Sequence, residues 1–230
     1  MGGVTEASPP PRDVTGQHFQ AVLLDSDSTL VDSEAAVARS WEAWADRYGV
    51  PLAQLGETHG MPSRQTIARL DRELGLGLDL EEAGAVFDEI ELSDLEDVVA
   101  LPGAREALEA LADRAAVVTS AGRPLATARL RSAGLTPPAV LVCADEVERG
   151  KPDPDPYLQA ATRLGVDPAR CLVVEDSAAG VRSGYAAGAA TLALLTTTPE
   201  AELGTADLVV PDLAAVRFQV EADGVRVSRP

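Results

Sequence analysis

The region from residue 115 to residue 210 alternates short apolar runs with longer segments of helical character, and this alternation constrains the fold more than any other feature. The runs are rich in Val, Leu and Ala, as in AAVVTS at 115–120 and CLVVE at 171–175. Strands that are apolar on both sides belong in a sheet covered on both faces, and helical connections of about 10–15 residues make such strands parallel. The sequence therefore predicts an α/β protein with a doubly wound parallel sheet.

The expected elements follow one another in a regular order. An apolar run at 19–25 predicts the first strand of the sheet. Pro124 and Gly134 mark the start and end of one helix, and Gly165 ends another. The tail around Asp223-Gly224 predicts a terminal hairpin. The remaining expected strands lie at 115–120, 139–143, 171–175, 191–195 and 208–210, and the expected helices at 124–134, 156–165 and 178–187.

A different pattern separates the first expected strand from the others. Residues 32–100 have helical periodicity, with Ser33 and Ser63 as expected N-caps of two helices and a third helix at about 80–92. Trp41 and Trp44 share one face of the first helix, so we expect them in the core of this segment. The predicted organisation is a tail at 1–17, a core formed by 18–31 and 101–230, and a helical insert at 32–100.

Composition excludes several classes of function. The chain has 37 acidic and 19 basic residues, a net charge of −18, and such a surface repels nucleic-acid backbones. No apolar run approaches the length of a membrane span, and residues 1–17 lack the apolar stretch of a secretory signal. Cys143 and Cys171 stand in apolar runs without metal-ligand spacing, so we expect two buried thiols. We therefore expect a cytoplasmic protein without a nucleic-acid or membrane partner.

One basic residue is exceptional. Eighteen of the 19 basic residues are Arg, and Lys151 is the only Lys. An ammonium is a compact, strongly hydrated point charge that a guanidinium does not reproduce. This exception directs attention to the loop that contains it.

Polar side chains stand where four of the expected strands end or soon after. The first strand ends at Asp25 and is followed closely by Asp27; Thr119 and Ser120 end the second. The sequence RGKPDP, at 149–154, follows the third strand, and Glu175-Asp176 ends the fourth. Because ligands of open parallel sheets bind beyond the carboxyl ends of the strands, we expect these groups to converge.

Carboxylates that lie so near one another repel each other and require a cation, and Mg²⁺ held by oxygen ligands meets this need. Asp25 could then attack a phosphorus atom and form an aspartyl-phosphate. Asp27 could protonate the leaving oxygen and later activate water. Thr119 and Lys151 would hold the phosphoryl oxygens. Each signal alone has a plainer explanation, such as loop chemistry for the Asp pair, but their ordered occurrence after four strands favours catalysis.

The four signals together resemble those of the haloacid dehalogenase-like superfamily of phosphotransferases. The resemblance extends over about residues 19–213 and implies a Rossmann-like core, with residues 32–100 as a helical cap. The matching motifs are DSDST at 25–29, VTS at 118–120, GKPDP at 150–154 and VEDSAAG at 174–180.

The resemblance also implies site residues and a class of substrate. Mg²⁺ would bind Asp25, the Asp27 carbonyl and Asp176, with Glu175 supporting or sharing the metal. The sequences HGMP at 59–62 and VTSAGRP at 118–124 are similar to those of glycerol-3-phosphate and sugar-phosphate phosphatases. We therefore expect a Mg²⁺-dependent phosphatase of a small phosphorylated sugar or polyol. The residues expected to bind its substrate are Ser120, His59 and Arg64.

Two positions depart from the pattern of these phosphatases. Ser28 stands where the first motif usually has Gly, which we expect to stiffen the turn. Met61 stands where the cap loop of the sugar phosphatases commonly has Arg, so the substrate is less defined than the chemistry.

The same scaffold supports other activities, which the sequence favours less than hydrolysis. Dehalogenases do not need Asp27, and the phosphonate hydrolases need a cap lysine that residues 32–100 lack. β-Phosphoglucomutase-like enzymes carry a cap His and a cap Arg, where this chain has Val37 and Ser63; Arg64 is one place along. A catalytically silent binding module is the third reading, since fold alone does not set function. The intact acids and Lys151 favour hydrolysis.

Overall fold

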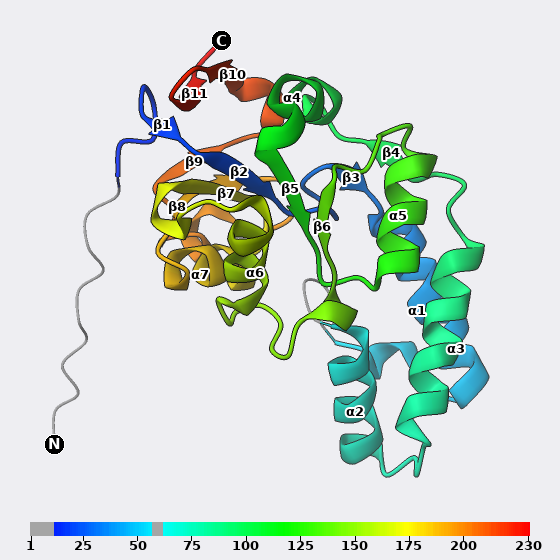
Figure 1. The fold of residues 1–230 in the computed structure, drawn as a ribbon. Coiled ribbons are helices and arrows are strands. Elements are labelled where there is room, and N and C mark those ends of the chain that lie inside the picture. Colours follow the sequence, from blue (N-terminus) through cyan, green and yellow to red (C-terminus); the bar gives the residue numbers. More distant parts are fainter. Residues whose placement is uncertain (1–11, 57–61) are drawn as a thin grey trace, which may run out of the picture.

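A six-stranded parallel sheet lies at the centre of the computed structural model, which describes residues 12–56 and 62–230 (Figure 1). Its strand order is β6-β5-β2-β7-β8-β9, and all neighbouring pairs are parallel. The strands are β2 (Ala21–Leu24), β5 (Ala115–Val118), β6 (Val140–Val142), β7 (Cys171–Glu175), β8 (Ala190–Leu194) and β9 (Leu208–Val210).

Both faces of the sheet are covered, which explains the continuously apolar strands. Val22 and Leu24 of β2 pack against one layer, whereas Ala21 and Leu23 pack against the other. The first layer contains α4 (Ala104–Leu111), α5 (Arg123–Ser132) and the C-terminal hairpin; the second contains α6 (Asp155–Leu164) and α7 (Ala178–Ala186). This arrangement confirms the predicted doubly wound fold.

The register of the central strands brings their carboxyl ends to one edge. Leu24 of β2 is paired with Val117 of β5 on one side and with Val174 of β7 on the other. The residues that follow these positions, Asp25 among them, therefore leave the sheet side by side.

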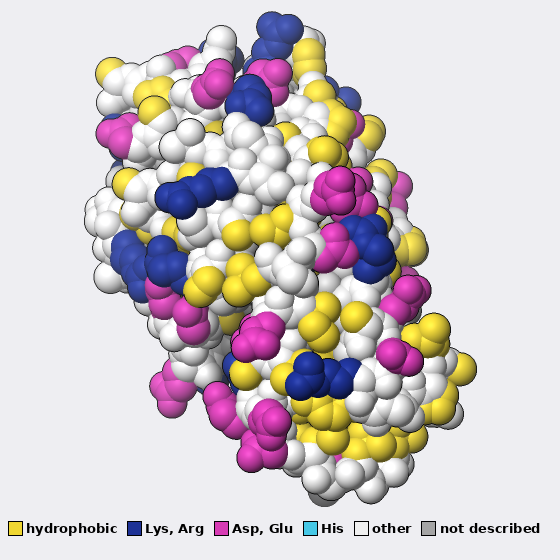
Figure 2. Space-filling model, turned by 90° about the vertical axis from the view of Figure 1, so that its right-hand side faces the viewer, with side chains coloured by type: hydrophobic (Ala, Val, Ile, Leu, Met, Phe, Trp, Pro, Cys, Tyr) yellow, Lys and Arg dark blue, Asp and Glu magenta, His cyan; other side chains and the backbone are white. Residues whose placement is uncertain are grey.

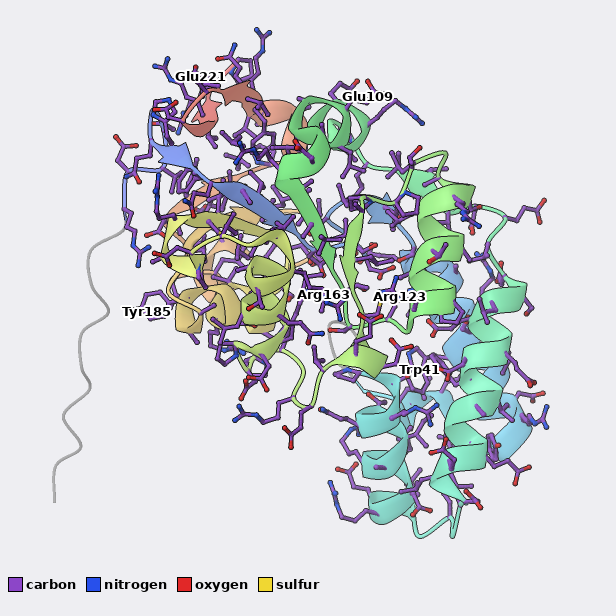
Figure 3. The ribbon with its side chains drawn as sticks, in the orientation of Figure 1. Trp41, Glu109, Arg123, Arg163, Tyr185 and Glu221 are labelled. Carbon is purple, nitrogen blue, oxygen red and sulfur yellow. The ribbon has the colours of Figure 1, made fainter. Side chains whose placement is uncertain are left out.

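Three helices between β2 and β5 form a second apolar core. They are α1 (Glu34–Tyr48), α2 (Ser63–Leu74) and α3 (Leu80–Ser93). Trp41 and Trp44 are buried in it, as predicted; Figure 3 marks Trp41 on α1. The Trp41 ring lies 4.1 Å from that of Phe87, and the Trp44 indole donates to the Ala83 carbonyl. The bulk of the aromatic residues in this segment is thus used for packing.

A short antiparallel ribbon stands where the chain enters and leaves the helical segment. Its strands are β3 (Val31–Asp32) and β4 (Val99–Ala100), and Val31 is paired with Ala100. The ribbon lies at the predicted boundaries of the insert at 32 and 100. Two short backbone connections, held together by this pairing, therefore join the helical segment to the sheet.

The helix starts in this segment differ from those predicted. Ser33 precedes α1, but its side chain accepts no capping bond; its hydroxyl donates to Asp27. Ser63 is the first residue of α2, which lacks a side-chain cap. At α3, Asp79 accepts hydrogen bonds from two backbone N–H groups. The first difference brings the helical segment into contact with the predicted catalytic acid.

The terminal segments pack on the sheet core. The predicted hairpin is confirmed as β10 (Arg217–Glu221) and β11 (Gly224–Ser228), and β1 (His18–Phe19) pairs with β11. Within the expected tail, Val14 is buried and the backbone N–H of Arg12 donates to Asp207. Cys143 and Cys171 are buried and form no disulfide.

None of the helices in the described ranges combines the length and apolarity needed to cross a bilayer.

Candidate active site

Three buried carboxylates and the only lysine meet at the carboxyl edge of the sheet. Asp25 directly follows β2, Glu175 is the last residue of β7, and Asp176 directly follows it. One oxygen each from Asp25, Glu175 and Asp176 lies within 4.8 Å of the others. The predicted convergence of these acids is therefore present in the structure.

Lys151 joins two of these carboxylates to the neighbouring strand. Its Nζ lies 2.5 Å from Asp25 Oδ1, 2.6 Å from Glu175 Oε1 and 3.0 Å from the Val118 carbonyl oxygen. These contacts use the three hydrogens of the ammonium. Burial alone would lower the pKa of Lys151, but the charges of Asp25 and Glu175 raise it well above its ordinary value. The ammonium thus stays charged and neutralises part of the cluster.

Glu175 is held on every side by protein donors. Its Oε1 accepts from Lys151 and from the Tyr157 hydroxyl at 2.9 Å. Its Oε2 accepts from the backbone N–H groups of Asp176 and Ser177 and from the Ser177 hydroxyl. The carboxylate occupies the space beside Gly180, where an added Cβ would lie 1.7 Å from Oε1. A glycine is therefore required at this point of the motif.

The surroundings of Asp25 raise its pKa. Its backbone N–H donates to Val174 O at 2.9 Å, which continues the sheet by one residue. Burial raises the pKa of Asp25 well above its ordinary value; Lys151 opposes this rise, and Glu175 and Asp176 add to it. A further positive charge beside this carboxylate would favour its ionised, nucleophilic form.

The donor set fits a hard divalent cation. The cluster of Asp25, Glu175 and Asp176 has three acidic groups against one ammonium, and carboxylate oxygens are the ligands that Mg²⁺ prefers. The Thr197 hydroxyl donates to Asp176 Oδ2 and orients that carboxylate. Because Glu175 already accepts from several protein donors, Asp25 and Asp176 are the better placed to bind a metal directly.

Asp27, the second acid of the first motif, accepts hydrogen bonds from a different set of side chains. Its Oδ1 accepts from the Ser33 hydroxyl at 2.7 Å and from Arg129 Nη1 at 2.9 Å. Its Oδ2 accepts from the Thr119 hydroxyl at 3.4 Å. Thr119 also accepts from the backbone N–H of Ala121 at 3.1 Å, so the hydroxyl is held at the start of the turn after β5.

The turn that follows Asp27 shows why glycine is usual at the position of Ser28. Ser28 has a φ of 63°, in the left-handed region that side chains rarely adopt. Its N–H donates to the Val31 carbonyl, and its own carbonyl accepts from the Thr196 hydroxyl at 2.6 Å. The serine thus keeps the turn that the motif requires, supported from the loop after β8.

The other predicted site residues are placed as follows. Ser120 is half-buried directly after Thr119. Arg64, on α2, pairs with Asp88 at 3.0 Å and with Glu81 at 3.6 Å, both on α3. His59 lies outside the described residues, as does Met61.

The comparisons with known proteins agree with this geometry. Residues 19–188 match the sequence model of the haloacid dehalogenase-like hydrolases. The chain belongs to the haloacid dehalogenase-like hydrolase family. Hexitol phosphatase A of Escherichia coli K12 is 41% identical over 209 residues, covering 88% of this chain and 95% of that protein. Validoxylamine A 7′-phosphate phosphatase of Streptomyces hygroscopicus subsp. limoneus is 34% identical, covering 87% and 97%.

Solved structures share this fold. A hydrolase from Pseudomonas syringae superimposes with a TM-score of 0.75 at 28% identity, covering 85% of this chain and 94% of that chain. The family and the fold predicted from the motifs are thus confirmed.

Sequence reasoning missed several residues that hold this family's motif residues in place. Tyr157 and Thr197 contact two of the acids, and Arg129 binds Asp27. Arg129 also binds Glu91 of α3 at 2.7 Å. Nothing in the sequence distinguishes Arg129 from the other 17 arginines. Glu91 stands in an acid-rich stretch that is typical of a solvated surface.

Proposed function

We propose that the protein is a Mg²⁺-dependent phosphatase that hydrolyses phosphomonoesters of small sugars or polyols through an aspartyl-phosphate. The main support for this proposal is the position of Asp25 at the carboxyl edge of the sheet, where its side chain is hydrogen-bonded to Lys151 and lies close to Asp176. The phosphatase relatives confirm the predicted enzyme class.

In the first step, an Asp25 carboxylate oxygen attacks the phosphorus atom. The bond between phosphorus and the sugar oxygen breaks, and its electron pair stays on that oxygen. Asp27 donates a proton to the leaving oxygen, so a neutral alcohol departs. Lys151 keeps the buried acids together at this stage by neutralising charge on Asp25 and Glu175.

In the second step, Asp27 removes a proton from water, whose oxygen attacks the phosphorus of the aspartyl-phosphate. The phosphorus–oxygen bond to Asp25 breaks, so inorganic phosphate leaves and the carboxylate is restored. Thr119, at the end of β5, would contact the phosphoryl oxygens together with Lys151; that contact requires one ammonium hydrogen now used within the protein.

Asp25, Asp176 and the Asp27 carbonyl would hold Mg²⁺, with Glu175 in support. Bound there, the cation would compensate the negative charge of the acids and of the transferring phosphoryl group. The clustering of the carboxylates and the raised pKa of Asp25 support this assignment.

Residues 32–100 are proposed as the cap that selects the substrate, with 18–31 and 101–230 as the core and 1–17 as a tail. Ser120, His59 and Arg64 are the proposed substrate contacts. Arg64 is held by acids of α3, so such a contact requires it to exchange partners. The relatives named for hexitol and validoxylamine phosphates support a small polyhydroxylated substrate.

The surface supports a small-molecule partner. Basic side chains on the face in Figure 2 are scattered among acidic ones. A nucleic-acid site requires basic side chains gathered into one patch, and this face shows no such patch. The predicted cap has 16 acidic and five basic residues, which also disfavours polymeric anions. We place the enzyme in the cytoplasm.

A phosphate-release screen tests the proposal. The protein is incubated with hexitol phosphates, hexose phosphates, glycerol phosphate and p-nitrophenyl phosphate, each with Mg²⁺ and with EDTA. We expect Mg²⁺-dependent release from at least one polyol or sugar phosphate, absent in Asp25→Asn. Release from none of them would contradict hydrolysis; isomerisation of a hexose 1-phosphate without release would identify the mutase reading instead.

A further inference from the structure

A buried arginine connects the second acid of the site to the helical segment. Arg129 lies on α5 of the core and is 4% exposed. Its Nη1 donates to Asp27 Oδ1 at 2.9 Å, and its Nη2 donates to Glu91 Oε1 at 2.7 Å. Glu91 belongs to α3 and is itself buried. The guanidinium therefore bridges the carboxylates of Asp27 and Glu91, which are 64 positions apart in the sequence.

These two carboxylates are what holds the guanidinium. Its third nitrogen, Nε, is buried without a hydrogen-bond partner in the part of the chain that the structure describes. Charge-assisted bonds of this kind are short and directional, and an arginine does not lose its charge in a protein. Removal of Glu91 would consequently leave Arg129 fixed by Asp27 alone.

We propose that Arg129 is a positioning residue for Asp27 and that Glu91 fixes Arg129 from the cap helix α3. The proposal rests on the proposed function, in which Asp27 is the acid and base. It adds two residues, one on each side of the boundary between core and cap, to the machinery of that reaction.

The asymmetry of the contacts explains how Arg129 would act. Asp27 Oδ1 receives two close donors, the Ser33 hydroxyl and Arg129 Nη1, whereas Oδ2 receives the 3.4 Å contact from Thr119. With Oδ1 held by two donors, Oδ2 is the oxygen left to exchange a proton with the leaving group or with water. Arg129 thus sets which carboxylate oxygen faces the reaction.

Glu91 extends this control to the cap. Helices α3 and α5 contact each other in the fold, and the bond between Glu91 and Arg129 crosses that contact. Ser33, which also binds Asp27, directly precedes α1, and α1 packs against α3. Two independent connections therefore make the position of Asp27 depend on how the helical segment sits on the core.

The test compares two leaving groups. A sugar or polyol alkoxide needs a proton as it departs, whereas p-nitrophenolate is stable as an anion and needs little help from an acid. We therefore measure kcat/KM, which reports the steps up to formation of the aspartyl-phosphate, for Arg129→Gln and Glu91→Gln with the best polyol phosphate of the wild type and with p-nitrophenyl phosphate. A displaced Asp27 lowers kcat/KM for the first substrate far more than for the second, whereas the second step, in which Asp27 activates water, is common to both and does not enter this ratio.

We expect Arg129→Gln to lower kcat/KM for the polyol phosphate by about 10–100-fold, with less than about a 3-fold loss of kcat/KM for p-nitrophenyl phosphate. Glu91→Gln should show the same pattern more weakly. The double variant should be no worse than Arg129→Gln, because both changes break one connection. Arg131→Gln is the matched control: this exposed arginine lies on the same helix, and we expect wild-type kinetics.

Arg123 offers a second control on α5. Its side chain lies near that of Arg163, and each of these two arginines donates a hydrogen bond to Glu146 (Figure 3). Arg123→Gln removes a bonded arginine without touching Asp27, so its effects should be equal on the two substrates.

Equal losses of kcat/KM on both substrates in Arg129→Gln, or no loss, would overturn the positioning role. If Arg129→Gln fails to fold, the double variant, in which Glu91 is no longer an unpaired buried charge, carries the same comparison. Failure of the proposed function is distinguishable, because the wild type itself would then release no phosphate from either substrate. A wild type active on both, with Arg129 variants unchanged, would reject only the positioning role.

Discussion

Lys151 Nζ lies 2.5 Å from Asp25 Oδ1 in a pocket where both side chains are almost fully buried. The partners come from loops 126 positions apart in the sequence, and the strand order β5-β2-β7 brings them together. This pairing keeps the proposed nucleophile beside a permanent positive charge while its second neighbour, Glu175, binds the same ammonium at 2.6 Å. The site thus depends on a compact cation with three acceptors around it.

The first prediction is that Lys151→Arg fails nearly as badly as Lys151→Ala. A guanidinium is larger and planar and cannot direct three donors to Asp25, Glu175 and the Val118 carbonyl in the same space. We expect roughly a 10²–10³-fold fall in kcat for both variants, measured at saturating Mg²⁺. Near-wild-type activity of Lys151→Arg would contradict the role given to this lysine.

The second prediction separates the two acids. Asp25→Asn should abolish turnover without unfolding the chain, because an amide is a poor nucleophile. Asp27→Asn should turn over slowly and, where the second step is the slower one, accumulate phosphate on Asp25. Mass spectrometry after brief exposure to substrate locates the phosphoryl group. Its appearance on another residue would refute the mechanism.

The third prediction concerns Gly180. In Gly180→Ala the new Cβ would lie 1.7 Å from Glu175 Oε1, so the carboxylate must leave its place between Lys151 and Tyr157. We expect a loss of about 1–3 kcal/mol in the free energy of unfolding, together with reduced activity. Urea unfolding measures the first quantity. Gly204→Ala is the control, since its nearest atom is 4.0 Å away; equal stability of the two variants would disprove the steric argument.

Much of this architecture follows from local signals in the sequence. The apolar runs predict strands because their residues must be covered on both faces, and β7 coincides with the run at 171–175. Gly165, the expected end of a helix, ends it in the left-handed conformation. The acids converge because parallel strands end at one edge, which needs no knowledge of side-chain packing.

The contacts that escaped prediction depend on the tertiary structure. Ser33 stands at the N-cap position, but its hydroxyl donates to the Asp27 carboxylate and accepts no hydrogen bond from the N–H groups of the helix. Glu91 resembles its solvated neighbours until tertiary packing buries it against Arg129. Such contacts depend on how two helices meet, and neither periodicity nor capping rules describe that meeting.

The last prediction uses the buried state of Glu91. Burial raises the pKa of this carboxyl from its ordinary 4.5 to about 7; Arg129 opposes the rise, and Asp27 and Asp88 add to it. Between these two values the folded chain holds a proton that the unfolded chain releases. The contribution of Glu91 to stability is therefore full below about pH 4.5 and falls until about pH 7.

Glu91→Gln should remove this fall. The free energy of unfolding of the variant minus that of the wild type should thus increase between pH 5 and pH 8, by at most about 3 kcal/mol. The comparison uses the change with pH, because loss of the bond to Arg129 lowers stability at every pH. Glu89→Gln, an exposed glutamate on the same helix, is the control and should show a constant difference. A difference for Glu91→Gln that is equally constant across this range would mean that Glu91 is ionised throughout, held so by Arg129.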